Sequence, residues 1–302
     1  MSSVILDVCK EVAKNMAMGI APLRAWRLKK PRTSLLFTGR DEELEHYAFI
    51  PVRSLLGVLG GVEGLDIVEV GPGDFLSSGL ALLAAGAASY TVIDRFPGQY
   101  QSREAKQWYV GVQRAWARLF PQLRWPAYLR AEEFPEAHRD RVKVLTGGVE
   151  EARSTQRYDI VCSYQVGEHV SDIGAFAQAN ARLLKSNGIA VHRVDFGPHD
   201  CWVNYKDPLT FLRFPDWLWS LMGSNRGTAN RRRHHEFCSA FEEAGLKVDV
   251  SSREFFDDKS FDRKRFATRF RHISDDSLAT KTGVYVCRPK RTSSGENPEA
   301  MS

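Results

Sequence analysis

The sequence predicts an α/β protein built on a doubly wound, mostly parallel sheet of seven strands, with an N-terminal helical cap and insertions. Three observations lead to this prediction. A short β-branched run at residues 65–70 is typical of a strand that is buried on both faces. A glycine turn and an apolar, small-residue-rich helix over 75–85 follow that strand. Strand and helix patterns then alternate along the chain, as they do in a sheet with crossover helices.

The composition agrees with one large domain that carries appendages. The chain has 302 residues, of which 43% are hydrophobic, so it can bury a sizeable core. Its net charge of +5 is modest and its basic residues are dispersed, which permits nucleic-acid binding without requiring it. We expect residues 1–60 to form the helical cap, 61–290 the main domain with insertions at about 96–140 and 201–245, and 291–302 a disordered tail.

The cysteines and the apolar runs indicate the cellular setting. The five cysteines are widely spaced and form no C-x-x-C pair, which predicts reduced thiols in a cytoplasmic protein. No apolar run approaches the ~20 residues of a membrane span, and the N-terminus lacks a signal-peptide pattern. We therefore expect a soluble, unprocessed chain that has no membrane partner, and the oligomeric state stays open.

The turn after the first strand, Gly71-Pro72-Gly73, is the centre of the expected ligand site. Two glycines within three residues allow a sharp turn and leave no Cβ between the backbone and a ligand. The second strand, 90–93, ends in Asp94, whose carboxylate can accept hydrogen bonds from two ribose hydroxyls. Asp74 would repel a pyrophosphate, so a nucleoside with a cationic arm suits this turn better than a dinucleotide does.

The motif E-V-G-P-G-D at 69–74, followed by an acidic residue at the end of the next strand, resembles the first two motifs of the class I S-adenosylmethionine-dependent methyltransferases. Residues 158–200 resemble the type 11 branch of that family, although Lys-Ser-Asn-Gly at 185–188 replaces the usual Lys-Pro-Gly-Gly. The resemblance implies a Rossmann-like methyltransferase fold, S-adenosyl-L-methionine as cofactor and S-adenosyl-L-homocysteine as product. It places cofactor contacts at or near the strand ends, at Glu69, Gly71, Gly73, Asp74, Asp94, Arg95, Val149 and Gln165.

The remaining elements follow from local patterns. Apolar residues at helical spacing, with start and stop signals, predict helices over 3–17, 51–59, 103–119, 173–184 and 235–244. Further strands are expected at 141–145, 158–163, 189–195, 246–250 and 283–287, and the resemblance implies that the last one is antiparallel to its neighbours. The aromatic-rich segment 201–245 forms either a wall of the substrate pocket or a small satellite core, and the two can coexist.

Polar residues at the carboxyl ends of these strands should converge on one cleft, because ligands of doubly wound sheets bind there. Methyl transfer requires alignment of the nucleophile and, for a hydroxyl, removal of its proton. Histidine suits the second task near neutral pH. We therefore predict that His192 and His199 act as base or orienting groups and that Asp195 fixes a tautomer, with a satisfied core histidine as the alternative for His192.

Substrate contacts are expected from segments that flank the cleft. We assign them to His169, Trp202, Tyr205 and Arg231. Arg231 belongs to an arginine triplet, which could bind an acidic group or could be a solvated helix start. His169 belongs to a Glu-His pair that is common to the resembled branch whatever the substrate, so a structural role is the alternative.

A divalent cation is a further option at the fifth strand. His192, Asp195 and His199 offer nitrogen and oxygen ligands of suitable type. Their spacing matches no known metal signature and no second cluster supports them, so we predict no metal.

These observations favour methyl transfer to a small molecule, at a hydroxyl oxygen, with no nucleic-acid partner. The alternatives are methylation of nitrogen or carbon, an RNA or protein methyltransferase, transfer of another arm of the same cofactor, and a cofactor-binding protein that transfers no methyl group. No Asn-Pro-Pro-Tyr-type motif follows the fourth strand, where Ser-Tyr-Gln-Val stands at 163–166, and this disfavours a planar exocyclic amine as acceptor. The intact glycine turn and Asp94 argue against a decayed cofactor site.

Overall fold

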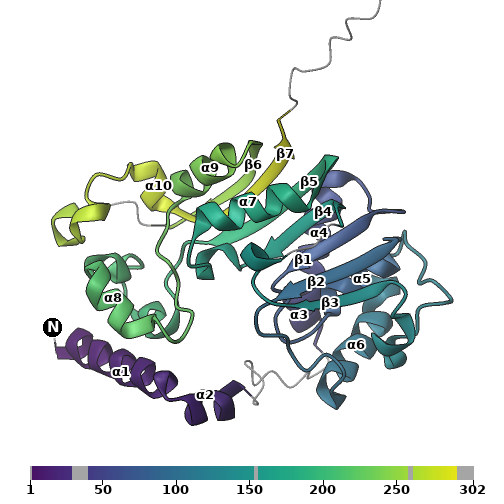
Figure 1. Ribbon diagram of the computed structural model, residues 1–302, viewed down its shortest axis with the longest axis horizontal. Coiled ribbons are helices and arrows are strands. Elements are labelled where there is room, and N and C mark those ends of the chain that lie inside the picture. Colours follow the sequence, from purple (N-terminus) through teal and green to yellow (C-terminus); the bar gives the residue numbers. More distant parts are fainter. Residues whose placement is uncertain (1, 29–39, 153–155, 258–260, 291–302) are drawn as a thin grey trace, which may run out of the picture.

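The computed structural model describes residues 2–28, 40–152, 156–257 and 261–290. Its strands form one sheet in the order β3-β2-β1-β4-β5-β7-β6, with helices on both faces (Figure 1). The strands are β1 (Asp66–Val70), β2 (Ser89–Asp94), β3 (Val142–Thr146), β4 (Tyr158–Tyr164), β5 (Leu184–Asp195), β6 (Leu246–Phe255) and β7 (Thr280–Pro289). β7 is antiparallel to β5 and β6, and the other neighbouring pairs are parallel. The predicted doubly wound, mostly parallel sheet is confirmed.

The helices predicted from the sequence are present, together with further short ones. They are α1 (Ser2–Gly19), α2 (Ala21–Leu28), α3 (Asp41–Leu44), α4 (Ile50–Leu59), α5 (Ser77–Ala84), α6 (Arg103–Leu119), α7 (Ile173–Leu183), α8 (Asp216–Gly223), α9 (His234–Glu243) and α10 (Asp275–Ala279). α6 begins where predicted because Ser102 caps it, with Ser102 Oγ accepting a hydrogen bond from Ala105 N at 3.1 Å. Residues 185–188, which separate the predicted helix 173–184 from the predicted strand 189–195, belong to β5, where the pairing with β4 has a register irregularity between Tyr158 and Ile160.

Two apolar cores lie on opposite faces of the sheet, because successive side chains of a strand point to opposite sides. Ile67 of β1 and Ile160 of β4 pack with α4, α5 and α6. Val68 and Val161 pack with α7 and α9. The central strands are therefore covered on both sides, as their β-branched sequences predicted.

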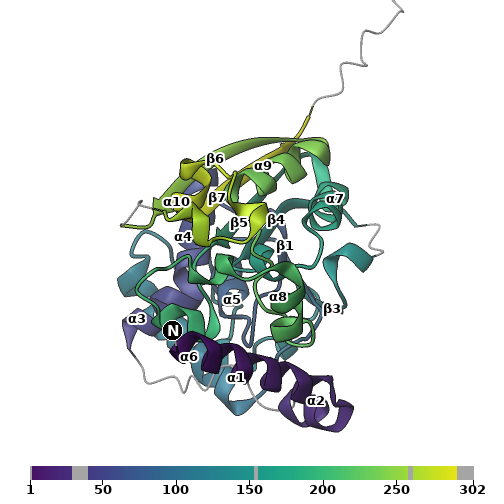
Figure 2. The same ribbon diagram turned by 90° about the vertical axis from the view of Figure 1, so that its left-hand side faces the viewer.

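A third apolar cluster lies beyond the sheet and joins segments that are far apart in sequence. Its buried members are Trp202, Leu209, Phe211, Leu212, Phe214, Met222, Phe256, Phe266, Phe270 and Leu278. α1 packs on this cluster through Val4, Val8 and Val12 and lies along α8 (Figure 2). Asn15 of α1 donates a hydrogen bond to Leu221 O at 2.9 Å. Much of the segment 201–245 thus forms a satellite core, one of the two alternatives that the sequence left open.

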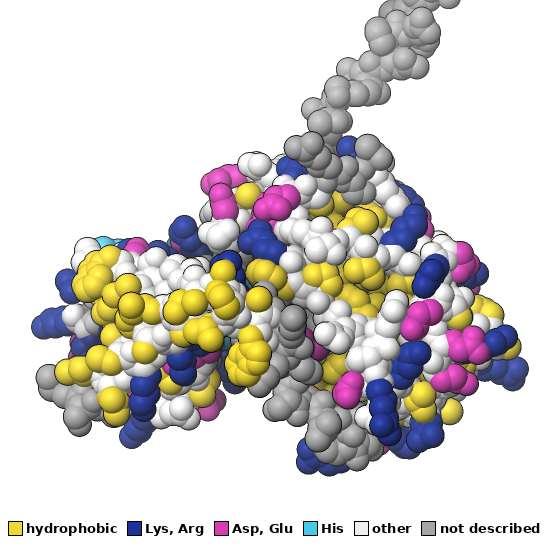
Figure 3. Space-filling model, turned by 60° about the horizontal axis from the view of Figure 1, so that its bottom comes forward, with side chains coloured by type: hydrophobic (Ala, Val, Ile, Leu, Met, Phe, Trp, Pro, Cys, Tyr) yellow, Lys and Arg dark blue, Asp and Glu magenta, His cyan; other side chains and the backbone are white. Residues whose placement is uncertain are grey.

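The N-terminal region packs in two places. α1 packs on the satellite core, whereas α4 is part of the first core through Val52 and Leu55. The outer side of α1 and α2 is also apolar, and exposed side chains gather there (Figure 3): Ile5, Leu6, Met16, Ile20, Leu23 and Trp26. No described helix has the length and apolar character that a membrane crossing requires. The tail expected at 291–302 lies outside the described residues.

Gly79 lies in α5 where this helix touches the Tyr90 ring of β2. A Cβ on Gly79 would lie 2.1 Å from Tyr90 Cε1, whereas a Cβ on the exposed Gly57 of α4 would meet nothing within 4 Å. We expect Gly79→Ala to lower the free energy of unfolding by about 1–3 kcal/mol through overpacking. Gly57→Ala should instead raise it by up to about 1 kcal/mol through helix propensity. Urea denaturation measures both values, and equal effects would contradict the close packing of α5 on β2.

Candidate functional site

The turn after β1 has the backbone geometry that a close-lying ligand requires. Gly71 and Gly73 have φ values of 67° and 83°, in the left-handed region that glycine adopts without strain. Nothing lies within 4 Å of the position that a Cβ of Gly73 would take, whereas a Cβ on Gly71 would lie 2.8 Å from Val166 Cγ2. The turn is therefore open at Gly73 and packs at Gly71 against the loop after β4.

Glu69 is held below this turn. Its oxygen Oε2 accepts hydrogen bonds from Ser78 Oγ at 2.7 Å and from Tyr90 Oη at 2.5 Å. Burial raises the pKa of Glu69 above its ordinary value, and the two donors oppose that rise. Glu69 thus links β1 to α5 and β2 through hydrogen bonds, two residues before the turn begins.

Asp94 ends β2 beside the turn. Its Oδ1 accepts a hydrogen bond from Phe96 N at 2.7 Å. The following loop packs on the turn, because a Cβ on Gly98 would lie 2.4 Å from the backbone oxygen of Asp74. Tyr100 is buried in this loop, and burial together with the Asp94 carboxylate raises its pKa. The sequence did not point to Tyr100, since a tyrosine in a loop carries no pattern of its own.

The other expected cofactor residues lie at or near the same edge of the sheet. Asp74 is half-buried in the turn, and Val149 is buried just after β3. Arg95 is exposed and forms an ion pair with Glu150 at 3.4 Å. Gln165 directly follows β4. The open glycine turn with a carboxylate at the end of β2 fits a nucleoside cofactor, because ligands of such sheets bind across these strand ends.

A cluster of Glu168, His169 and His199 lies beyond the carboxyl ends of β4 and β5. One carboxylate oxygen and one ring nitrogen from each histidine all lie within 4.8 Å of one another. The ring centroids of the two histidines are 5.0 Å apart. The loop that carries Glu168 also carries Val166, which touches the turn at Gly71. Glu168 and His169 are therefore carried by the same loop that packs on the glycine turn.

Glu168 is the unusual member of the cluster. Its exposed fraction is 3%, and neither carboxylate oxygen has a hydrogen-bond partner among the described residues. Burial raises its pKa to about 8, and the carboxylate of Asp195 adds to the rise. The backbone amides of Glu168 and Asp195 oppose the rise but lie outside hydrogen-bond geometry. A buried carboxylate without partners is costly, so this position indicates that something else completes the site.

The two histidines offer free nitrogens for different reasons. His169 Nδ1 lies 2.9 Å from the carbonyl oxygen of Gly227, which can only accept, so Nδ1 carries the proton and Nε2 the lone pair. His169 is exposed overall, but partial desolvation of its ring and the neighbouring His199 lower its pKa. His199 Nε2 is buried and has no hydrogen-bond partner within the described part of the chain. No role was predicted for Glu168, although its position between a strand end and a histidine is a signal that could have identified it.

Backbone strain is concentrated at the flanks of this cluster. Gln165, Asp200 and Arg231 have φ values of 56°, 53° and 62°. Residues other than glycine pay about 1–2 kcal/mol each in this left-handed region. Gln165 lies just before the Glu168 turn, and Asp200 directly follows His199. Strain of this kind is common at functional sites, where the surrounding fold imposes it.

His192 lies away from the cluster, so the structure does not support its predicted role as a base. It is fully buried, its Nδ1 lies 2.8 Å from Ser163 Oγ, and its ring stacks on Phe241 at 5.2 Å. Burial lowers its pKa to about 3. The alternative of a core histidine describes it better, although its Nε2 has no hydrogen-bond partner among the described residues. Asp195 lies close enough to Glu168 to affect its pKa, and its Oδ1 accepts a hydrogen bond from Gly197 N at 2.7 Å.

Three residues assigned to the substrate serve the satellite core instead. Trp202 has an exposed fraction of 2% and belongs to that core. Tyr205 Oη donates a hydrogen bond to Asp7 Oδ2 of α1 at 2.7 Å. Arg231 is buried, donates to Phe214 O at 2.5 Å, and has a pKa that burial lowers to about 10. These side chains are used within the fold, so the substrate contacts predicted for them are not supported.

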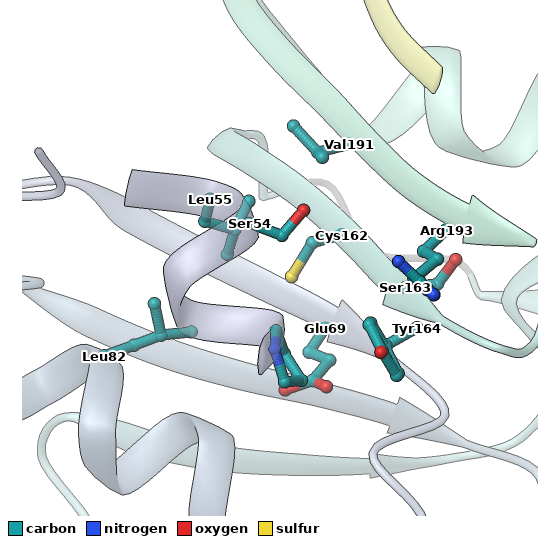
Figure 4. A pocket seen from close by; sticks show the side chains of 10 residues that line it. Ser54, Leu55, Glu69, Leu82, Cys162, Ser163, Tyr164, Val191 and Arg193 are labelled. Carbon is teal, nitrogen blue, oxygen red and sulfur yellow. The ribbon is translucent and has the colours of Figure 1, made fainter. Parts of the chain in front are cut away.

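A pocket opens beside Glu69 on the α4 face of the sheet (Figure 4). Ser54 of α4 lines it, together with Tyr164 and Arg193 near the carboxyl ends of β4 and β5. The Arg193 guanidinium lies over the Tyr164 ring at 5.5 Å and pairs with Glu254 at 3.0 Å. The sequence did not assign Tyr164 or Arg193, although both lie at strand ends. The pocket extends the candidate site past the carboxyl ends of β4 and β5.

Comparison with known proteins gives consistent matches. Residues 43–250, more than half of the chain, match a family model described as a methyltransferase domain. A ubiquinone biosynthesis O-methyltransferase of Rhodopseudomonas palustris (strain HaA2) is 51% identical over 43 residues, which is 14% of this chain and 17% of that relative's length.

Solved structures with a similar fold have low sequence identity. YcgJ from Bacillus subtilis has a TM-score of 0.45 and 14% identity over 79% of this chain and 97% of that one. An S-adenosylmethionine-dependent methyltransferase from Mesorhizobium loti has a TM-score of 0.41 and 14% identity over 78% and 95%. Magnesium protoporphyrin IX methyltransferase from Synechocystis PCC 6803, with bound SAH, has a TM-score of 0.42 and 14% identity over 88% and 93%.

The buried position of His192 makes stability depend on pH. Its pKa is 6.5 in a model peptide and about 3 in the fold, so between these values only the unfolded chain binds the proton. The contribution of His192 to the free energy of unfolding is complete above pH ~6.5. It is lost toward pH 3, at about 1.4 kcal/mol per pH unit. We expect urea denaturation at pH 7 and pH 5 to give a steeper loss for the wild type than for His192→Gln. Identical losses would contradict a neutral, buried His192.

Proposed function

Since this chain belongs to the class I S-adenosylmethionine-dependent methyltransferases, we propose that it methylates a hydroxyl oxygen of a small molecule and that His199 assists the loss of the hydroxyl proton. S-adenosylmethionine is the cofactor, and S-adenosylhomocysteine is the product. The hydroxyl acceptor rests on one observation above all. Glu168, His169 and His199 bring unpartnered oxygen and nitrogen atoms together beside the glycine turn.

The residues at the ends of β1 and β2 would hold the cofactor. The open side of the turn at Gly73 leaves room for the ligand, and Asp74 would attract its ammonium group. Asp94 would accept hydrogen bonds from the ribose hydroxyls, and the Val149 backbone would lie along the adenine. The left-handed glycines and the placement of Asp94 at the end of β2 support these assignments.

Methyl transfer is an in-line displacement that demands alignment of the acceptor. The acceptor oxygen bonds to the methyl carbon while the electrons of the carbon–sulfur bond return to sulfur, which leaves a neutral thioether. A hydroxyl must also lose its proton, so an oxygen acceptor needs a group that draws the proton away. His199 offers a buried ring nitrogen without a partner in the described structure, and this supports its role. Asp195, expected to fix a tautomer, would instead contribute negative charge beside Glu168.

The contacts of the arginine triplet at 231–233 favour a small-molecule acceptor over a nucleic acid. Arg233 has an exposed fraction of 0% and donates hydrogen bonds to Phe196 O at 2.7 Å and Thr280 O at 2.9 Å. Arg231 is buried as well, and Arg232 pairs with Glu236. The triplet is therefore occupied within the fold and offers no phosphate-binding fork. The short match to a ubiquinone biosynthesis O-methyltransferase agrees with an oxygen acceptor in a small molecule.

The cofactor assignment is tested at Asp94. We expect Asp94→Asn to weaken S-adenosylmethionine binding by about 10- to 100-fold, because hydrogen bonds to a charged acceptor are stronger than those to a neutral amide. The amide oxygen still accepts from Phe96 N, so the loop after β2 should keep its structure. Isothermal titration gives the affinity, with the exposed Asp140→Asn as control. Unchanged binding by Asp94→Asn would remove Asp94 from the cofactor site.

The acceptor proposal is tested at His199. A panel of phenols and alcohols is first screened by mass spectrometry for the gain of one methyl group. We then expect His199→Ala to lower kcat by about 100-fold, the size of a typical proton-transfer contribution, while S-adenosylmethionine affinity stays the same. The exposed His272→Ala serves as the matched control. An unchanged kcat, or equal methylation of acceptors whose hydroxyls are blocked, would contradict the proposal.

A further inference from the structure

The cluster beside the glycine turn has the composition of a metal-binding site. Two imidazole nitrogens and one carboxylate oxygen, from His169, His199 and Glu168, all lie within 4.8 Å of one another. A single ion placed among the three atoms would be within reach of each. We propose that these residues bind a divalent transition-metal cation, for which zinc is the best match. The sequence had suggested no metal here, and the set it considered contained His192, which lies elsewhere in the fold.

The unpaired carboxylate of Glu168 is the first observation that supports this site. Both oxygens of Glu168 are buried and lack hydrogen-bond partners among the described residues. Arg193 opposes the rise in the pKa of Glu168, but its guanidinium pairs with Glu254, and Arg226 pairs with Glu11 and Asp200. Asp195 adds a further negative charge nearby. The surroundings therefore favour a cation, and a bound ion would satisfy a group that is otherwise costly to bury.

The orientation of His169 is the second support. Its Nδ1 donates to the Gly227 carbonyl at 2.9 Å, which leaves the Nε2 lone pair available. Metal-bound histidines commonly donate their other ring N–H to a carbonyl or carboxylate in this way, which fixes the ring and its tautomer. Gly227 belongs to the segment between α8 and α9, so this segment holds the His169 ring in place. His199 Nε2 is also buried and without a partner in the described structure.

The ligand set decides which cation is favoured. Magnesium and calcium prefer oxygen ligands and bind imidazole poorly. Two histidines and one carboxylate match the set of several catalytic zinc sites, in which a further position is left for water or substrate. Zinc also brings no redox chemistry, which agrees with a methyl transfer that needs none. A cation with three protein ligands here would keep a position for the acceptor.

The role of the cation in catalysis rests on the proposed function, whereas its binding does not. An acceptor hydroxyl that coordinates the cation becomes more acidic, and its proton passes to solvent water. The oxygen then forms its bond to the methyl carbon as the carbon–sulfur bond breaks. In that case His199 assists proton loss by holding the cation.

Metal binding can be measured without any acceptor. The full-length protein is treated with EDTA, dialysed, and titrated calorimetrically with zinc chloride and separately with magnesium chloride. We expect about one zinc per chain. Glu168→Gln and His169→Ala should each weaken zinc binding by at least about 10-fold. The exposed His272→Ala should leave zinc binding unchanged. Thermal melting and S-adenosylmethionine titration of each variant report whether its fold and cofactor site are intact.

Several results would overturn the metal site. These are no zinc binding by the wild type, equal zinc affinity in the wild type and the cluster variants, or binding of magnesium without zinc. His169 lies at the surface, so His169→Ala provides a test even if Glu168→Gln does not fold. Zinc binding at the cluster without methylation of any hydroxyl acceptor would keep the metal site and overturn the proposed acceptor. The two proposals can therefore fail separately.

Discussion

The contact between Gly71 and Val166 is the constraint on which the candidate site depends. A Cβ at position 71 would lie 2.8 Å from Val166 Cγ2, and the backbone there is left-handed, so only glycine fits without strain. This close approach brings the loop after β4 against the turn after β1. Glu168 and His169 follow Val166 within that loop. The glycine turn therefore has two roles. It leaves room for a cofactor, and its packing against Val166 sets how close the loop that carries Glu168 and His169 lies to the cofactor site.

The satellite core supports the cluster from the other side. Asn230 donates hydrogen bonds to Gly167 O at 2.8 Å and to Val170 O at 2.9 Å, on either side of Glu168 and His169. His169 is itself tied to Gly227. These bonds hold the loop in a geometry that includes a left-handed Gln165. The segment between β5 and α9 thus acts on the site through the backbone of the β4 loop, although its aromatic side chains pack among themselves.

The sequence predicted the fold and the glycine turn well because both depend on local patterns. β-branched runs, glycine spacing and an acid at the end of β2 are visible within short windows. It could not distinguish His192, which lies within β5, from His199, which follows that strand, because no local pattern shows that the His192 ring packs on Phe241. The burial of Arg231 and Trp202 was not visible in the sequence for a related reason. Trp202 belongs to a cluster with residues of α1, α8 and the segments 256–257 and 261–278, and Arg231 lies over the rings of Trp219 and Phe270. No local pattern reveals these contacts.

Glu69 and Glu168 show why burial alone does not identify a functional carboxylate. Both are nearly inaccessible and burial raises the pKa of both. Glu69 accepts hydrogen bonds from Ser78 and Tyr90, so its desolvation is compensated within the fold. Glu168 has no such partner in the described structure. A satisfied carboxylate has little further affinity for a ligand, whereas an unsatisfied one gains by binding a proton, an acceptor hydroxyl or a cation. Of these two groups, Glu168 is therefore the one available for chemistry.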